Sequence, residues 1–96
     1  MSQENAVRKA QDYLNYTAFS RQGLITQLVT EEQFSADDAT YAVDSLNVDW
    51  NQQAAKKAKD YLNYTAFSHA SLLNQLIEEE KFTPSQAAYG VNAAGL

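Results

Sequence analysis

Apolar residues recur at helical spacing in six separate stretches of the chain. The first stretch covers roughly residues 3–16 and the fourth covers roughly residues 50–64, and both carry the same apolar stripe. The stripe consists of Ala6, Ala10, Tyr13 and Leu14 in the first stretch, and of Ala54, Ala58, Tyr61 and Leu62 in the fourth. One proline and three glycines leave few helix breakers in the chain. The pattern predicts an all-α fold with six helices.

A residue that can cap a helix precedes each of the five later stretches. Ser20 and Ser68 precede the second and fifth helices, Ser35 and Thr83 precede the third and sixth, and Asp49 precedes the fourth. Their side-chain oxygens can accept hydrogen bonds from backbone N–H groups of the first helical turn. After Thr83, a proline at the first helical position and a glutamine at the third complete a capping box. These residues predict where the helices begin.

The two halves of the chain are copies of each other at an offset of 48 residues. Residues 12–20 read DYLNYTAFS, and residues 60–68 read the same nine letters. By our alignment roughly 21 of about 48 positions are identical, far above chance for a comparison at fixed period. The sequence therefore predicts two tandem three-helix repeats of the helix-turn-helix kind, over residues 1–48 and 49–96.

Trp50 lies where the two copies join. Its counterpart in the first copy is Ser2, so the repeat itself does not require a tryptophan there. A unit of about 48 residues buries too little surface to be very stable alone. The junction also contains no glycine or proline. We therefore expect Trp50 to lie at the repeat interface and the two repeats to pack as one rigid six-helix unit.

Groups that carry catalysis or hold cofactors are scarce in this sequence. The chain has no cysteine, and its three glycines are too far apart to form a phosphate-binding loop. Its one histidine, His69, aligns with Arg21, which favours a surface position over a catalytic one. The motifs typical of zinc and calcium sites are also missing. We predict a protein that is not an enzyme and that uses neither a cofactor nor a metal ion.

The charge pattern argues against nucleic-acid binding. The short turn between the second and third helices resembles the arrangement in DNA-reading proteins. However, Asp37 and Asp38 occupy the start of the third helix, where such proteins place groups that contact bases and phosphates. The net charge of −5 adds to this repulsion. We expect no nucleic-acid partner.

An acidic segment, residues 31–44, is the first candidate partner-binding surface. It contains five acidic residues and no basic one: Glu31, Glu32, Asp37, Asp38 and Asp44. One interpretation is a solvated surface that keeps the module soluble. The other is an electronegative patch that attracts a basic segment of a partner protein.

Tyrosines form the second candidate set, and each occurs in both copies. Tyr13 and its copy lie on the core stripe and are expected to be structural. Tyr41 and Tyr89 lie off their helix stripe, and we favour packing against the first helix of their repeat over exposure. Tyr16 and Tyr64, at the ends of the first helices, are expected to be exposed aromatic anchors for a partner.

The motifs in both copies resemble those of a known family. The chain reads A-x-x-Y-L-x-x-x-x-F-S-x-x-x-L-x-x-Q-L, then F-[ST]-x-x-x-A-x-Y-[AG]-V, then a link reading V-D-W. This pattern resembles the Ltp family, the host cell surface-exposed lipoproteins of Gram-positive bacteria and their prophages. The resemblance covers residues 6–48 and 54–91, which is nearly the whole chain in both copies.

The resemblance implies a location and a role. It implies tandem helix-turn-helix modules held at the outer face of the cell membrane by a lipid anchor. This chain lacks the signal peptide and the lipidated cysteine, so the anchor rests on the resemblance alone. It also implies superinfection exclusion, in which a prophage lipoprotein blocks DNA injection by a second phage. The implied partner is the phage tail tape measure protein, and we expect a monomer.

A rival interpretation comes from a different class of function. The same module could be a structural or adhesive cell-surface domain that binds cell-wall or host components and has no role against phage. An acidic helical repeat without cysteines suits both interpretations. The two differ in whether phage DNA entry is blocked in cells that display the protein.

Overall fold

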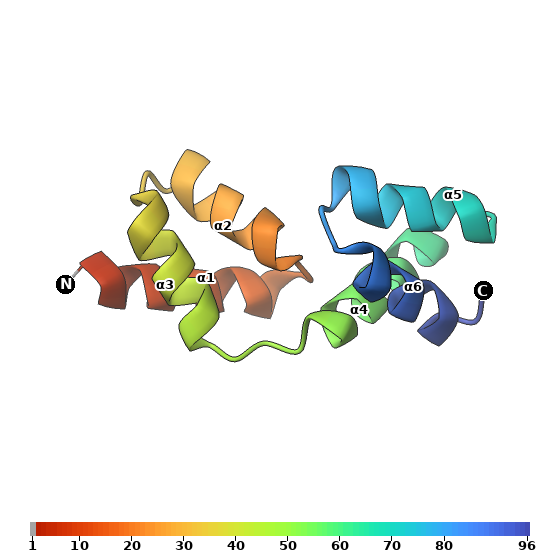
Figure 1. Ribbon diagram of the computed structural model, residues 1–96, viewed down its shortest axis with the longest axis horizontal. Helices are drawn as coiled ribbons and strands as arrows, with labels where there is room; N and C mark the ends of the chain where they lie inside the picture. Colours follow the sequence, from red (N-terminus) through yellow and green to blue (C-terminus); the bar gives the residue numbers. More distant parts are fainter. Residues whose placement is uncertain (1) are drawn as a thin grey trace.

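The computed structural model describes residues 2–96, which form α-helices, one π-helical segment and no strand. The predicted all-α fold of two three-helix repeats is confirmed (Figure 1). The first repeat contains α1 (Ser2–Tyr16), α2 (Arg21–Thr30) and α3 (Ala36–Ser45). The second contains α4 (Trp50–Tyr64), α5 (His69–Asn74), the π-helical segment η1 (Gln75–Glu79) and α6 (Pro84–Ala93). The two bundles lie one after the other along the long axis of a molecule measuring 44 × 22 × 20 Å.

The predicted capping residues begin the helices as expected. Ser20 accepts a hydrogen bond of 2.9 Å from Gly23 N, and Asp49 accepts one of 3.2 Å from Gln52 N. Ser35, Ser68 and Thr83 also accept hydrogen bonds from the third residue of their helices, and Thr83 forms the predicted capping box. Each such cap is worth about 1 kcal/mol. The caps therefore fix five helix starts locally, before any tertiary contact.

Each repeat has its own hydrophobic core, built where its first and third helices approach closely. The first core consists of Ala10, Leu24, Ile25, Leu28, Ala39 and Val43. The second core consists of Ala54, Ala58, Leu72, Leu76, Phe82, Ala87 and Val91. Alanines on the facing sides of the first and third helices let the two backbones come together, while leucines of the middle helix fill the space beside them.

Helices α6 and α4 approach each other closely at Gly90. Gly90 of α6 lies directly against Ala54, and a Cβ atom built on Gly90 would be 2.7 Å from both the carbonyl carbon and the carbonyl oxygen of Ala54. Backbone atoms cannot move aside as a flexible side chain can. Ala42 occupies the equivalent position in α3, so only the second repeat needs a glycine here.

Gly90→Ala should lower the free energy of unfolding by about 1–2 kcal/mol, measured by chemical denaturation. Overpacking a well-packed contact costs typically 1–3 kcal/mol, and the helix propensity of alanine recovers up to about 1 kcal/mol. Ala42→Gly is the matched control, and it should destabilise mainly through lost helix propensity. A Gly90→Ala protein more stable than the wild type would show that α4 and α6 have room to separate.

The middle helix of the second repeat differs from that of the first. Instead of continuing as an α-helix, it widens into η1, where Glu80 N donates to Gln75 O across 3.3 Å. At the equivalent place in the first repeat, Glu31 N donates to Gln27 O across 3.0 Å with ordinary α-helical spacing. The hydrophobic pattern predicted no such difference, because a single wide turn leaves the apolar stripe intact.

Polar contacts join the two repeats near the turn that follows α1. Phe19 N donates to Gln53 Oε1 across 3.0 Å, and the hydroxyl of Ser20 donates to the backbone carbonyl of Glu80. Both Ser20 and Gln53 are buried. From the sequence we expected Trp50 to join the repeats, and we did not identify Ser20 or Gln53. Buried, satisfied polar pairs of this kind fix one relative orientation of the elements that they join.

Trp50 also connects the two repeats. It is the first residue of α4, yet its side chain packs, half-buried, against the core of the first repeat. The energetic importance of this contact stays a prediction.

Candidate functional site

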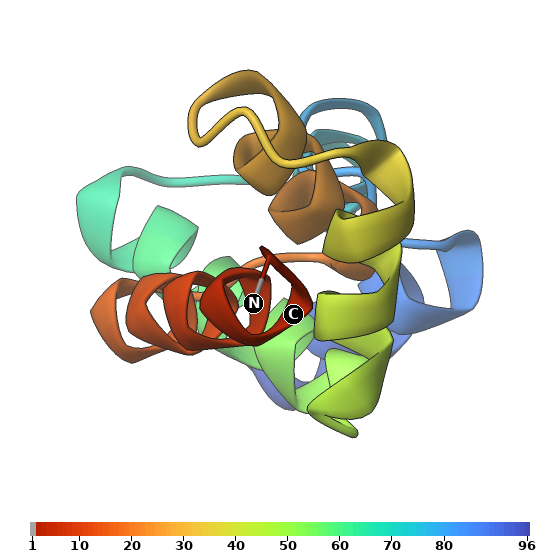
Figure 2. The same ribbon diagram turned by 90° about the vertical axis from the view of Figure 1, so that its left-hand side faces the viewer.

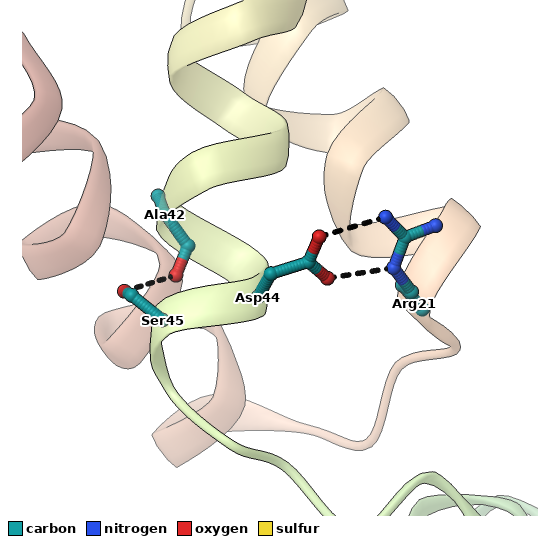
Figure 3. A network of polar contacts seen from close by, with 4 residues as sticks. All are labelled: Arg21, Ala42, Asp44 and Ser45. Carbon is teal, nitrogen blue, oxygen red and sulfur yellow. Dashed lines mark hydrogen bonds and ion pairs between the residues drawn. The ribbon is translucent and has the colours of Figure 1, made fainter.

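The acidic segment predicted as a partner-binding surface is partly neutralised within its own repeat. Arg21 at the start of α2 donates two hydrogen bonds, 2.7 and 2.9 Å long, to the carboxylate of Asp44 in α3 (Figure 3). Glu32 accepts a hydrogen bond from the Tyr13 hydroxyl, and Lys9 Nζ lies 3.7 Å from it. Two of the five candidate acids are therefore engaged inside the module.

The bidentate pair also changes the ionisation of its members. Hydrogen bonding to Arg21 lowers the pKa of Asp44, and hydrogen bonding to Asp44 raises the pKa of Arg21. Asp44 thus remains a carboxylate over a wide pH range but presents little unbalanced charge to a partner. Beside it, Ser45 Oγ donates to the Ala42 carbonyl across 2.8 Å near the end of α3 (Figure 3).

Three acids remain as an electronegative surface. Glu31 lies at the end of α2, and Asp37 and Asp38 lie in the first turn of α3, where negative charge is favoured by the helix N-terminus. Among residues 2–96, no cation forms an ion pair with any of these three. The surface predicted from sequence is therefore smaller than its five residues suggested.

Each repeat contains the same partly buried tyrosine network. Tyr13 donates to Glu32 and lies 3.5 Å from Gln27 Nε2, while Tyr61 donates to Glu80 and accepts from Gln75 Nε2 across 3.2 Å. The two rings also meet a phenylalanine edge-on, with centroid distances of 5.7 and 5.6 Å. Tyr13 and its copy are structural, as predicted. The sequence signal for the network was the recurrence of tyrosine, glutamine and glutamate at one offset.

Alkaline pH should destabilise the protein through these tyrosines. The hydrogen bond to Glu32 raises the pKa of Tyr13, while burial, followed by the hydrogen bond to Glu80, raises the pKa of Tyr61. Because the folded state holds these protons more tightly, their contribution to stability is complete below about pH 10, the ordinary tyrosine pKa. It is lost as the pH rises through the raised values. The free energy of unfolding, followed by urea denaturation across this range, should therefore fall with pH.

The variants that test this prediction are Tyr61→Phe and Tyr64→Phe. Tyr61→Phe should flatten the alkaline decline, since the titrating hydroxyl is removed. Tyr64→Phe removes a hydroxyl from an exposed ring and should leave the slope unchanged. Equal slopes in the two variants would contradict the role assigned to Tyr61.

The remaining tyrosines are all exposed. Tyr16 is 86% exposed and Tyr64 is 89% exposed, as expected for these helix ends. Tyr41 and Tyr89 are 52% and 41% exposed, so the preference for packing over exposure was wrong. In the second repeat, the face of α6 at Gly90 approaches α4 too closely to admit a ring between the two helices. Tyr89 still touches the first helix of its repeat at the surface, where its hydroxyl accepts a hydrogen bond of 2.9 Å from Gln52 of α4.

Two equivalent depressions adjoin the exposed tyrosines Tyr16 and Tyr64. The depression on the first repeat has a volume of about 250 Å³ and that on the second about 270 Å³. Their linings match at the offset of the repeat: Lys9, Asp12, Tyr13 and Tyr16 in the first, and Lys57, Asp60, Tyr61 and Tyr64 in the second. The sequence contains these linings as a repeated K-x-x-D-Y-x-x-Y motif, but only Tyr16 and Tyr64 of this motif were predicted to be binding residues.

A third depression of about 470 Å³ adjoins the other two. It lies between the end of α1 and the side of α4, and it shares Tyr16 with the first depression and Asp60 with the second. We call the three together the tyrosine groove. Its lining residues come mainly from α1 and α4, whose C-terminal ends both lie on the left-hand side of the molecule in Figure 2.

Other features of the described residues bear on the candidate chemistry. His69 is exposed at the start of α5, as predicted. Within residues 2–96, no three histidine, aspartate or glutamate side chains converge in a way that could hold a metal ion. No helix in this part of the chain has the length and apolar character needed to cross a membrane.

Comparisons with known proteins bear on identity. The family model for host cell surface-exposed lipoproteins, Ltp, matches residues 2–46 and again residues 49–93. A solved structure is similar over 100% of this chain and 96% of its own, with a TM-score of 0.89 and 35% sequence identity. It is described as Ltp, a superinfection exclusion protein from the Streptococcus thermophilus temperate phage TP-J34. Among curated proteins, none matches this chain significantly.

Proposed function

Because the chain belongs to the family of host cell surface-exposed lipoproteins, Ltp, we propose that it acts in superinfection exclusion. In this function it binds the tape measure protein of an incoming phage tail at the cell surface and so blocks DNA injection. The observation that carries the proposal is the similarity to a superinfection exclusion protein over both repeats and the whole chain. The tape measure protein as partner follows from the resemblance to the family.

The described surface suits protein recognition. Exposed tyrosines are among the side chains that contribute most to protein–protein binding, because their rings offer a large contact area at low entropic cost. Here Tyr16 and Tyr64 occur at equivalent positions of two repeats that share buried polar contacts. A preorganised surface loses little conformational entropy when it binds.

The proposal is tested in cells that display the full-length, lipid-anchored protein. We expect phage to adsorb normally while DNA entry is blocked, measured by plaque counts together with an assay of phage DNA in the cytoplasm. Cells that display the anchor without residues 2–96 are the control. Full phage sensitivity, with surface display verified, would favour the rival function of a structural or adhesive module for cell-wall or host components.

The acidic surface is proposed to attract basic stretches of the partner. Reversing the charge of Asp37 and Asp38 to lysine should weaken binding to the tape measure protein by about tenfold at low salt. The effect should shrink near physiological ionic strength, where the Debye length is about 8 Å. Affinity is measured by calorimetry on folded variants, since the new charges also oppose the helix dipole.

The matched control for this prediction changes the same amount of charge elsewhere. Glu78 and Glu79 are exposed acids of the second repeat, and their replacement by lysine gives the same net charge. If the two double variants lose affinity equally, net charge decides binding. If Asp37 and Asp38 can be reversed with no loss, their surface has no part in binding.

A further inference from the structure

The tyrosine groove differs in charge from the rest of the molecule. Four of the seven basic residues line it: Lys9, Lys56, Lys57 and Lys59. Only Asp12 and Asp60 among the twelve acidic residues do so. The groove therefore carries a net positive charge of two in a chain whose net charge is −5. A partner that is drawn to the acidic remainder would not be drawn to this side.

The lysines of the central depression point their charge at solvent. Lys56 and Lys59 are exposed, and no ion pair within residues 2–96 engages either of them. Lys57 Nζ lies 3.5 Å from Thr17 Oγ1, and Lys9 is shared with Glu32. Two of the four cations are thus held in place by the fold, and two remain available to an incoming anionic group.

Apolar contact area lies beside these charges at both ends of the groove. Tyr16 and Tyr64 expose nearly whole rings, and the rings of Tyr13 and Tyr61 form part of the floor of the two end depressions. The central depression shares Tyr16 with one end depression and Asp60 with the other, so the three adjoin one another. A ligand that fits must therefore combine apolar side chains, which contact the tyrosines, with carboxylates, which meet the lysines.

We propose that the tyrosine groove is a docking site for an acidic protein segment that carries exposed apolar side chains at two places. The two end depressions have the same composition, so each takes one apolar group, and the lysines between them pair with acidic residues of the intervening chain. Engaging both ends raises affinity because the second contact is intramolecular. The idea that the phage protein is the ligand of this groove rests on the proposed function. Whether the groove binds an acidic segment at all can be tested without phage.

The direct test uses two synthetic peptides of the same length, each with two tryptophans separated by a spacer. The spacer is rich in glutamate in one peptide and rich in lysine in the other. The isotopically labelled domain is titrated with each peptide and followed by NMR. We expect the glutamate peptide to shift amide signals of α1 and α4 along the groove in both repeats, and the lysine peptide to bind at least about tenfold more weakly. Equal binding of both peptides, no binding, or shifts confined to other surfaces would overturn the proposal.

Variants of the groove provide the second arm. Tyr16→Ala with Tyr64→Ala, and separately Lys56→Glu with Lys59→Glu, should each weaken the glutamate peptide by at least about tenfold. The matched control is Tyr41→Ala with Tyr89→Ala, which removes two exposed tyrosines from outside the groove and should leave affinity unchanged. All four substitutions in the groove variants lie at exposed side chains, so the fold should survive. Loss of affinity in the control, or none in the groove variants, would overturn the proposal.

The same variants separate this proposal from the function on which it draws. If the wild-type protein excludes phage and the groove variants do not, both proposals are supported. If exclusion persists in groove variants that have lost the peptide, the groove is not the phage site and the inference is wrong in that part. If the wild-type protein fails to exclude phage, the proposed function fails, and the peptide titration still decides whether the groove binds.

Discussion

Replacement of Leu76 by alanine is expected to lower the free energy of unfolding by about 2–5 kcal/mol. Leu76 is completely buried in the core of the second repeat, and its carbonyl accepts the hydrogen bond from Phe82 N that turns the chain toward α6. Truncation leaves a cavity that the surrounding alanines are too small to fill. Because domains of this size have a total stability of about 5–15 kcal/mol, the loss is a large share.

Leu28→Ala is the matched variant in the first repeat. Leu28 is equally buried, and its carbonyl accepts an equivalent hydrogen bond from Phe34 N. In urea denaturation, both variants should move one common transition, since the repeats are joined by buried contacts. Two separate transitions in Leu76→Ala would show that the repeats unfold independently. A loss below about 1 kcal/mol would contradict the burial assigned to this side chain.

The parts of the fold that depend on neighbours in sequence could be predicted. The helix starts at Ser20, Ser35 and Thr83 depend on one side chain and a backbone N–H three residues away. The core stripes depend on a period of 3.6 residues, which the sequence displays directly. Because the sequence is repeated, each helix is predicted from two independent segments, and the prediction for one half of the chain supports that for the other.

The surface charge could not be predicted as well, because it depends on contacts between distant residues. Asp44 is neutralised by Arg21, which lies 23 residues earlier, and Glu32 is engaged by Tyr13, 19 residues earlier. Counting the acidic residues along residues 31–44 does not reveal these partners. The basic character of the tyrosine groove was hidden for the same reason, since its lysines come from α1 and α4 in a net acidic chain.

The orientation of Tyr41 and Tyr89 was missed because it depends on the distance between helices. Their recurrence in both copies suggested a shared core role. In the second repeat, the close contact between Gly90 and Ala54 shows that α6 and α4 meet backbone to backbone, which leaves no space for a ring there. Interhelical distance depends on all the small residues at the contact together and is not a property of one position.

Trp50→Ala should lower the free energy of unfolding by about 2–3 kcal/mol. The side chain packs half-buried on the core of the first repeat, and roughly 100 Å² of buried aromatic surface is worth about 2.5 kcal/mol. A fully buried ring would cost about 3–5 kcal/mol. For a domain of this length, the expected loss corresponds to a fall of roughly 10–20 °C in the thermal midpoint, which calorimetry or circular dichroism can measure.

Two further variants distinguish the contribution of the Trp50 ring from that of the polar contacts between the repeats. Trp50→Phe keeps most of the apolar contact and should cost less than half as much as Trp50→Ala. Gln53→Ala removes the acceptor of Phe19 N and leaves that partly buried amide unsatisfied, and an unsatisfied buried donor costs about 1–3 kcal/mol. Because both residues tie α4 to the first repeat, the double variant should deviate from additivity. A thermal midpoint unchanged by Trp50→Ala would mean that the polar contacts alone join the repeats.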